Sequence, residues 1–119
     1  MTTHQKIALQ LITHSSAHTS WEKVLQKSLL KVDQHYLQSL LEDQSWLPGK
    51  QKLFAAFQQP SSNCRYILFG ESPYPRAESA NGIAFYDAAV DQLWSDNGLS
   101  KPINRATSLR NIMKALLLA

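Results

Sequence analysis

One short apolar run constrains the fold of this chain more than any other feature. Residues 65–69 read Arg-Tyr-Ile-Leu-Phe and stop abruptly at Gly70. A brief β-rich run without polar alternation is typical of a parallel strand that is buried on both faces. Such a strand needs neighbouring strands, and the sequence offers only one further candidate, Ile83–Phe85. We therefore expect an α/β fold in which this chain holds one or two parallel strands.

The remainder of the chain is predicted to be mostly helical. Apolar side chains recur at helical spacing from residue 20 to residue 43, with a break expected near Val32–Asp33. Ser20 is a favourable N-cap for the first of these turns. Further helices are expected over residues 51–57, over 87–95, and from Thr107 or Ser108 to the end.

The final predicted helix lacks an ordinary ending. It runs into Leu116-Leu117-Leu118-Ala119 without a glycine or a polar cap. Because the chain also has too few strands for a sheet, residues 1–119 are interpreted as a single partial domain, cut inside a larger α/β domain. The alternative is a small helical domain with one odd strand, which the apolar end disfavours.

Composition and cysteine usage narrow the class of protein. The chain is 44% hydrophobic and 18% charged, an ordinary globular balance. No apolar run approaches the ~20 residues of a membrane span, and the start does not have the pattern of a signal peptide. Cys64 is the only cysteine, so no internal disulfide can form. We expect its side chain to be buried. These features favour a cytoplasmic protein without membrane contact.

Metal binding is not expected. His14 and His18 are four residues apart and would share a helix face, a spacing that zinc ligands sometimes have. No third ligand accompanies them, so we interpret both as surface histidines.

Positive charge gathers towards the end of the chain. The net charge is +2 over residues 1–64, −3 over 65–96 and +4 over 97–119, where no acidic side chain occurs. An acid-free basic segment favours a polyanionic partner. The alternative is a solvated helix face, which charge alone favours.

The loop after the apolar run carries the most specific motif. Its text is Gly70-Glu71-Ser72-Pro73-Tyr74-Pro75, followed after four residues by Ala80-Asn81-Gly82-Ile83-Ala84-Phe85. This resembles the first catalytic motif of uracil-DNA glycosylases, Gly-Gln-Asp-Pro-Tyr-His and then Ala-His-Gly-Leu-x-Phe. Six positions of that motif fall in register here without a gap: Gly70, Pro73, Tyr74, Ala80, Gly82 and Phe85.

The resemblance extends on both sides of the loop. Residues 46–57 resemble the helix that leads into the family's strand, and residues 108–116 resemble its Ser-Leu-x-Asn-Ile helix. The match therefore covers roughly residues 20–119. It implies the N-terminal portion of a three-layer uracil-DNA glycosylase-like fold, with the C-terminal half of the family domain and its second catalytic motif absent.

The resemblance implies roles for the loop residues. Phe85 would stack on a uracil flipped out of DNA, and Tyr74 would sit against uracil C5 and exclude the methyl group of thymine. Gly70 and Pro73 would shape and stiffen the loop around the base. The alternative for either aromatic is core packing, which composition alone favours.

Several positions depart from the family pattern. Ser72 replaces the aspartate that orients or activates the attacking water, and a serine hydroxyl is no base near neutral pH. Glu71 replaces a glutamine, Pro75 replaces a histidine, and Asn81 stands where the family has another histidine. Another branch of the superfamily carries Gly-Glu-Ala-Pro-Gly here and is active without the aspartate. We therefore expect Glu71 to polarise water or stabilise a developing sugar cation.

The implied function is hydrolysis of the N-glycosidic bond of a flipped uracil in DNA repair, without metal or cofactor. We expect this chain to be a monomer and to be inactive by itself, because the second motif is missing. Lys101, Arg105 and Ser108 would bind the DNA backbone weakly. The alternatives are a non-catalytic DNA- or protein-binding module of the same superfamily and a small helical interaction protein.

Overall fold

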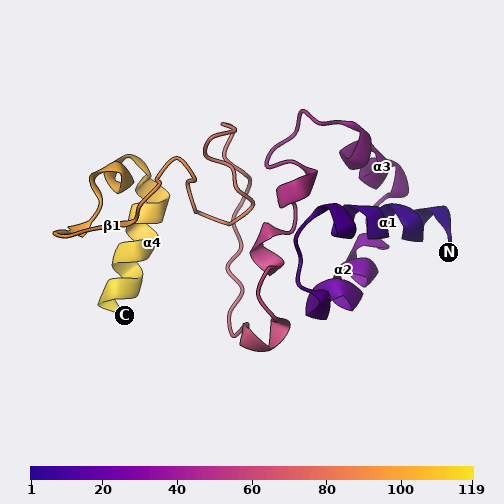
Figure 1. Cartoon of the computed structure of the whole chain (residues 1–119), viewed down its shortest axis with the longest axis horizontal. Helices are drawn as coiled ribbons and strands as arrows, with labels where there is room; N and C mark the ends of the chain where they lie inside the picture. The colour runs from indigo at the N-terminus through magenta and orange to yellow at the C-terminus, as the bar shows by residue number, and fades with distance from the viewer.

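The structure is a computed structural model that describes all 119 residues. Its elements gather in two lobes joined by a long, mostly irregular segment (Figure 1). We call residues 3–63 the helical lobe, residues 64–87 the central segment and residues 88–118 the carboxyl-terminal lobe. The radius of gyration is 16.4 Å, against about 13.5 Å for a compact domain of this length. The chain is therefore extended for its size.

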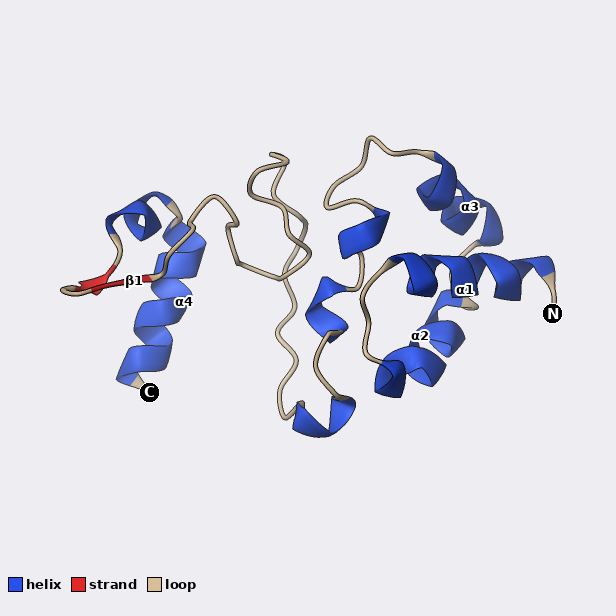
Figure 2. Cartoon of the chain, viewed as in Figure 1, coloured by secondary structure: helices blue, strands red, loops and turns tan.

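Figure 2 shows that helix dominates both lobes. The helical lobe contains α1 (Thr3–His14), α2 (Glu22–Leu29), α3 (Gln34–Glu42) and the 3-10 helices η1 (Thr19–Trp21), η2 (Lys50–Lys52), η3 (Ala55–Phe57) and η4 (Ser61–Asn63). The carboxyl-terminal lobe contains β1 (Trp94–Ser95), β2 (Gly98–Leu99), η5 (Lys101–Arg105) and α4 (Thr107–Leu118). None of these helices is long and apolar enough to cross a membrane.

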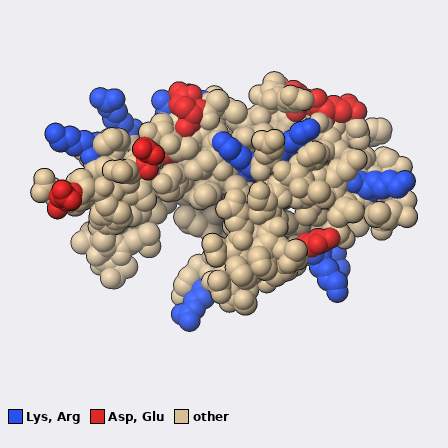
Figure 3. Space-filling view, in the orientation of Figure 1, with Lys and Arg blue, Asp and Glu red and all other residues tan.

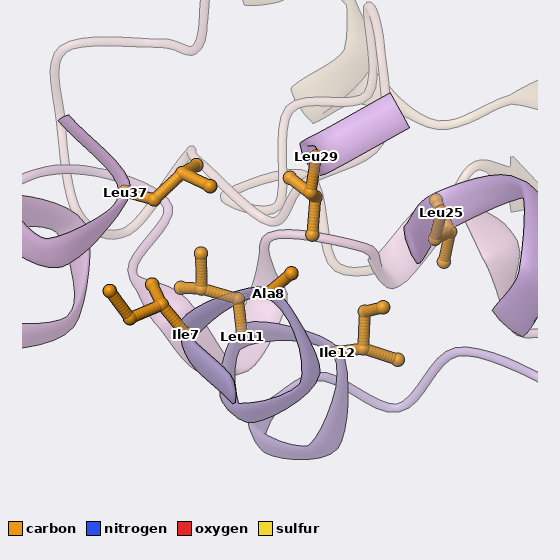
Figure 4. Packing of buried hydrophobic residues seen from close by; sticks show 7 residues of the cluster. All are labelled: Ile7, Ala8, Leu11, Ile12, Leu25, Leu29 and Leu37. Atoms are coloured by element: carbon orange, nitrogen blue, oxygen red, sulfur yellow. The ribbon is translucent and has the colours of Figure 1, made fainter. Parts of the chain in front are cut away.

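Helix α1, which the sequence analysis missed, is the centre of the larger core. Its buried side chains Ile7, Ala8, Leu11 and Ile12 face Leu25, Leu29 and Leu37 from α2 and α3 (Figure 4). The signal was present in the sequence, because these four apolar residues of α1 recur at helical spacing. A capping box also marks the start, since Thr2 and Gln5 each bond the other's backbone N–H.

The predicted break in the helix over residues 20–43 is confirmed. Helix α2 ends at Leu29, and Asp33 caps α3 by accepting a 2.9 Å hydrogen bond from the Tyr36 backbone N–H. The predicted N-cap is wrong, because Ser20 lies within η1 and Trp21 occupies the N-cap of α2.

The predicted strands are wrong in place and direction. Residues 65–69 belong to no strand, and Ile83–Phe85 forms none either. The only sheet is the antiparallel β1–β2 hairpin, in which Trp94 pairs with Leu99 and Ser95 with Gly98. A parallel strand forms only beside a neighbour, and residues 65–69 have no neighbouring strand in this chain.

Three other local predictions need correction. No helix forms over residues 87–95, because Asp96 and Asn97 make a two-residue turn that commits the flanking residues to the hairpin. The helix expected over 51–57 is two separate 3-10 turns. Cys64 is exposed rather than buried, since the segment that follows it packs against no sheet. The mostly helical character expected for the chain is nevertheless confirmed.

Helix α4 begins without the cap that the sequence suggested. Its N-cap is Ala106, and neither Thr107 nor Ser108 occupies that position. The helix instead packs Leu109 against Val90, Ile103 and Ala106, which form the small core of the carboxyl-terminal lobe. Burial of this face, rather than a capping side chain, fixes where α4 starts.

Candidate functional site

The central segment folds around a cavity of about 520 Å³. Most of its lining comes from two stretches of the loop, residues 70–75 and 80–86. The helical lobe adds Pro48 and Leu53, and α4 adds Ser108. The cavity therefore lies where the central segment meets both lobes.

Most of the site residues named from the sequence line this one cavity. They are Gly70, Glu71, Ser72, Pro73, Tyr74, Asn81, Phe85 and Ser108. Lys101 and Arg105 do not line it; both are exposed on η5, immediately before α4. Ala84 and Tyr86 also contribute to the wall, although neither was predicted as a site residue. Ala84 lies within the loop motif and Tyr86 directly follows it, which was the available signal.

Tyr74 and Phe85 approach each other across the loop. The Tyr74 hydroxyl donates a long, 3.5 Å hydrogen bond to the Phe85 carbonyl. Phe85 has a φ of 64°, which makes it the only non-glycine residue with positive φ. Bulky side chains rarely adopt this conformation, which costs on the order of 1–3 kcal/mol and is concentrated at functional sites. The fold therefore holds Phe85 in a strained position on the cavity wall.

A clasp closes the loop behind these two aromatics. Ala80 and Asp87 form an isolated antiparallel bridge, and the Ala88 N–H donates to the Ser79 carbonyl at 2.9 Å. The buried Asp87 carboxylate accepts a 2.9 Å hydrogen bond from the Ala89 N–H and faces Arg76 at 3.4 Å. These contacts tie both ends of residues 76–88 together.

Gly82 allows the loop to pack closely against the helical lobe. Its φ is +83°, and a Cβ there would collide with the Lys52 carbonyl oxygen and press against the Ala55 Cβ at 3.0 Å. Only glycine combines that backbone conformation with so close an approach. The glycine therefore positions the second half of the cavity wall on η2 and η3.

The polar side of the cavity is open to solvent. Glu71 and Ser72 are both exposed. The only ion pair in the structure joins Arg76 and Asp87, so Glu71 has no cationic partner within the chain. A solvent-facing carboxylate at the mouth of an apolar cavity can act on a water molecule or on a developing positive charge.

The N-terminus of α4 forms one edge of the cavity. The first backbone hydrogen bond of that helix runs from the Arg110 N–H to the Ala106 carbonyl, and no side chain caps the earlier N–H groups. Unpaired N–H groups at a helix start favour an anion. Ser108 stands in this first turn, with its side chain exposed.

A metal site is not apparent in this fold. No group of three or more His, Cys, Asp or Glu side chains lies close enough to hold a metal ion. His14 ends α1, whereas the Nδ1 atom of His18 lies 2.8 Å from the Ser20 hydroxyl and caps η1. The two histidines thus belong to different elements.

The chain is similar to known uracil-DNA glycosylases. It is 29% identical over 75 residues to a "Uracil-DNA glycosylase" of Thermobifida fusca, a match that covers 60% of this chain and 33% of that protein. The crystal structure of wild-type UNG from Nitratifractor salsuginis superposes with a TM-score of 0.80 at 39% identity. That match covers 96% of this chain and 45% of the neighbour.

A mutant of the same Nitratifractor salsuginis protein, with one tyrosine replaced by glycine, superposes with a TM-score of 0.82 at 38% identity. That match covers 98% of this chain and 47% of the mutant protein. No protein-family model matches the chain. This chain thus spans a third of the curated relative and less than half of each structural neighbour.

Fold and sequence agree on one relationship. The structural matches take in nearly the whole chain at more than a third identity, and the curated match points to the same kind of protein. The resemblance to the uracil-DNA glycosylase superfamily is therefore confirmed, and the structure matches a mostly helical fragment of its α/β fold.

Proposed function

We propose that this chain provides the base-binding part of a uracil-DNA glycosylase-like protein that acts in DNA repair. One observation carries the proposal: eight residues to which the resemblance gave a role at the site line a single cavity. Its volume of about 520 Å³ lies within the range of roughly 300–1,000 Å³ typical of small-molecule sites. A flipped nucleotide inserts a flat base into such a pocket.

The aromatics would recognise the base. Phe85, held at positive φ on the wall, offers a face for stacking. Tyr74 lines the same cavity, and its hydroxyl donates a 3.5 Å hydrogen bond to the Phe85 carbonyl. In this arrangement Tyr74 contacts uracil at C5, where thymine carries a methyl group, and the pocket discriminates by exclusion.

Glu71 would assist the chemistry. As water attacks C1′ of the deoxyribose, the bond from C1′ to the base nitrogen breaks and its electron pair leaves with uracil. Positive charge develops on the sugar as the water oxygen bonds to C1′. The Glu71 carboxylate either accepts the proton that this water loses or stabilises the charge on the sugar while the proton passes to solvent. Ser72 cannot replace it as a base, because its hydroxyl stays protonated near neutral pH.

DNA would be held mainly through its phosphates. The uncapped start of α4 at Ser108 lies on the edge of the cavity, and Lys101 and Arg105 precede it on the exposed η5. On the face seen in Figure 3, basic and acidic side chains are interspersed and form no continuous basic surface. We therefore expect weak binding, with dissociation constants on the order of 10⁻⁴ to 10⁻⁶ M at physiological salt.

The chain matches only part of its structural neighbour, which affects the activity expected of the chain alone. The chain spans 45% of its structural neighbour, and the resemblance implies a second catalytic motif that it does not contain. We propose that this domain is one part of the catalytic unit, and that the chain by itself does not release uracil at a useful rate. Removing one hydrogen-bond donor to the developing charge in such a site raises the barrier by about 3–4 kcal/mol.

A paired assay tests the proposal. Binding of an oligonucleotide with one uracil is compared with the thymine counterpart by fluorescence anisotropy, for the unaltered chain and for Phe85→Ala. We expect a preference for uracil that Phe85→Ala abolishes. Equal binding of both oligonucleotides by the unaltered chain would overturn the base-binding role.

The alternative is a non-catalytic binding module of the same superfamily, favoured by Ser72 at the position of the usual aspartate. Uracil release distinguishes the two in a protein that includes the whole fold. There Glu71→Gln should slow release more than Ser72→Ala does. Uracil-selective binding with no release from the whole fold would favour the module. Release by the purified 119-residue chain would contradict its proposed inactivity.

A further inference from the structure

We propose that Lys50 forms a second phosphate site for DNA, on the side of the cavity away from η5. This rests on the proposed function, because a nucleotide whose base enters the cavity has a phosphate on each side of its sugar. The cations of η5 belong to the carboxyl-terminal lobe. The helical lobe lies on the other side of the central segment (Figure 1), and Lys50 stands where that lobe meets the cavity.

The local geometry places Lys50 at the rim of the cavity. Pro48 and Leu53 both line the cavity, and Lys50 lies between them at the start of η2. A 3-10 helix has three residues per turn, so side chains three residues apart lie one above the other. Leu53 continues η2 with helical backbone angles, φ −55° and ψ −43°. Lys50 therefore shares the side of this turn that contributes Leu53 to the cavity.

The turn that carries Lys50 is fixed against the cavity wall. The Lys52 N–H closes the turn with a 3.0 Å hydrogen bond to the Gly49 carbonyl. The loop backbone at Gly82 approaches the Lys52 carbonyl so closely that a Cβ there would collide with it. The Lys50 side chain therefore extends from a defined point, as a residue that positions a ligand requires.

The charge of Lys50 is not used within the chain. Its side chain is half-buried, whereas the neighbouring Gln51 and Lys52 are exposed. Lysine typically packs its aliphatic stem on the protein and keeps its ammonium group in water. No carboxylate pairs with this ammonium group, since the only ion pair in the structure joins Arg76 and Asp87. The rim thus offers a free positive charge on a side chain that is partly held in place.

The chemistry of this position fits a DNA phosphate. An ammonium group is a compact point charge with three donors, and lysine is a common phosphate ligand. A base that stacks on Phe85 lies inside the cavity, so the sugar-phosphate backbone crosses the rim. Lys50 would hold the phosphate on the side of the helical lobe, and Lys101 and Arg105 the one on the other side. Contacts from two lobes would centre the target nucleotide over the cavity.

The salt dependence of binding gives the first test. The affinity of the chain for a thymine-containing duplex is measured by fluorescence anisotropy over a range of salt concentrations. We expect Lys50→Ala to reduce the slope of log K against log salt by about 0.9, the value for one phosphate contact, and Lys50→Arg to retain it. Lys52→Ala is the matched control, because Lys52 lies on another side of the same turn. An unchanged slope in Lys50→Ala, or equal changes in Lys50→Ala and Lys52→Ala, would overturn the proposal.

An uncharged phosphate locates the contact. In two uracil-containing duplexes, a methylphosphonate replaces the phosphate immediately 5′ or 3′ of uracil. We expect Lys50→Ala to lose its effect on one of these duplexes, and Lys101→Ala with Arg105→Ala to have a smaller effect on the other. If Lys50→Ala keeps its full effect on both duplexes, or shares its phosphate with the η5 pair, Lys50 does not bind across the cavity from η5.

The phosphate site and the base-binding role fail separately. Equal binding of uracil and thymine duplexes by the unaltered chain would overturn the base-binding role, and the slope on thymine DNA would still decide whether Lys50 contacts a phosphate. A preference for uracil together with an unchanged slope in Lys50→Ala would overturn the phosphate site alone.

Discussion

The helical lobe buries its apolar side chains in a core of its own, whereas the central segment leaves its apolar run exposed. In the helical lobe, seven buried apolar residues from three helices form one core. In the central segment, the four consecutive apolar residues 66–69 are exposed to solvent, although each has a large apolar side chain like those of the helical core. The difference lies in the partners: α1, α2 and α3 are neighbours in sequence, whereas residues 65–69 need strands that this chain does not supply.

The sharpest test of this contrast truncates one leucine in each region. Leu11 has no exposed surface and lies in the helical core, whereas Leu68 is 61% exposed. We expect Leu11→Ala to lower the free energy of unfolding by about 2–5 kcal/mol and Leu68→Ala by less than about 0.5 kcal/mol. Urea denaturation measures both. A large loss from Leu68→Ala would mean that residues 65–69 are buried in the folded chain.

The seating of the loop on the helical lobe gives the next largest effect. Gly82→Ala forces a side chain into a positive-φ site and against the Lys52 carbonyl, so we expect a loss of about 1–3 kcal/mol. Gly98 also has positive φ but has open space around it, which makes Gly98→Ala the control for strain alone. Equal losses in denaturant for the two variants would contradict the proposed contact.

The ion pair between Arg76 and Asp87 joins an exposed side chain to a buried one, so the two partners can be tested separately. Asp87→Ala leaves the Ala89 N–H without its partner and should cost about 1–3 kcal/mol. Arg76→Ala removes a side chain that is 59% exposed, and its 3.4 Å ion pair is screened by solvent, so we expect less than about 1 kcal/mol. Thermal unfolding of the two variants ranks them. A larger effect at Arg76 would show that the ion pair, not the turn, holds the loop.

The basic residues of η5 should act on DNA binding without affecting stability. Lys101→Glu with Arg105→Glu removes two phosphate contacts, and the slope of log K against log salt should fall in magnitude by about 1.8 for duplex DNA. Lys23→Glu with Lys27→Glu on α2 is the matched control. If both pairs change the slope equally, binding is not localised to η5.

The smallest effect concerns a turn in the helical lobe. Hydrogen bonds from the Ser45 hydroxyl and then from the Ser45 backbone N–H hold the pKa of Asp43 below its ordinary value of 3.8. The folded state therefore gains stability from this group above pH 3.8, and loses it as the pH falls through the lower folded value. An NMR titration should give a low pKa, which Ser45→Ala raises. No change in Ser45→Ala would contradict the assigned cause.

How much the sequence could predict varies with the range of the interactions. The loop motif from Gly70 to Phe85 placed residues that do line one cavity, because a continuous loop carries its own turns and glycines. The apolarity of residues 65–69 predicted a strand, and that prediction is wrong for this chain, because strand formation is decided by partners distant in sequence. The strain at Phe85 and the contact of Gly82 with Lys52 are likewise tertiary effects that no local pattern contains.

Two errors had local signals that were overlooked. Helix α1 has both a capping box and an apolar face, and the Asp96–Asn97 turn is a typical two-residue hairpin connection. In the second case, the helical spacing of Val90 and Trp94 competed with the turn. In the hairpin, Trp94 is half exposed, whereas Val90 is buried in the small core of the carboxyl-terminal lobe.

The most direct test of the base-binding role follows individual amides as DNA is added. An NMR titration with an oligonucleotide containing uracil, and a parallel one with thymine, reports which part of the chain responds. We predict uracil-specific shifts at Tyr74, Asn81 and Phe85, with none at Leu11 in the helical core. Identical shifts with both oligonucleotides, or shifts confined to residues away from the cavity, would contradict the assignment of this cavity to a flipped uracil.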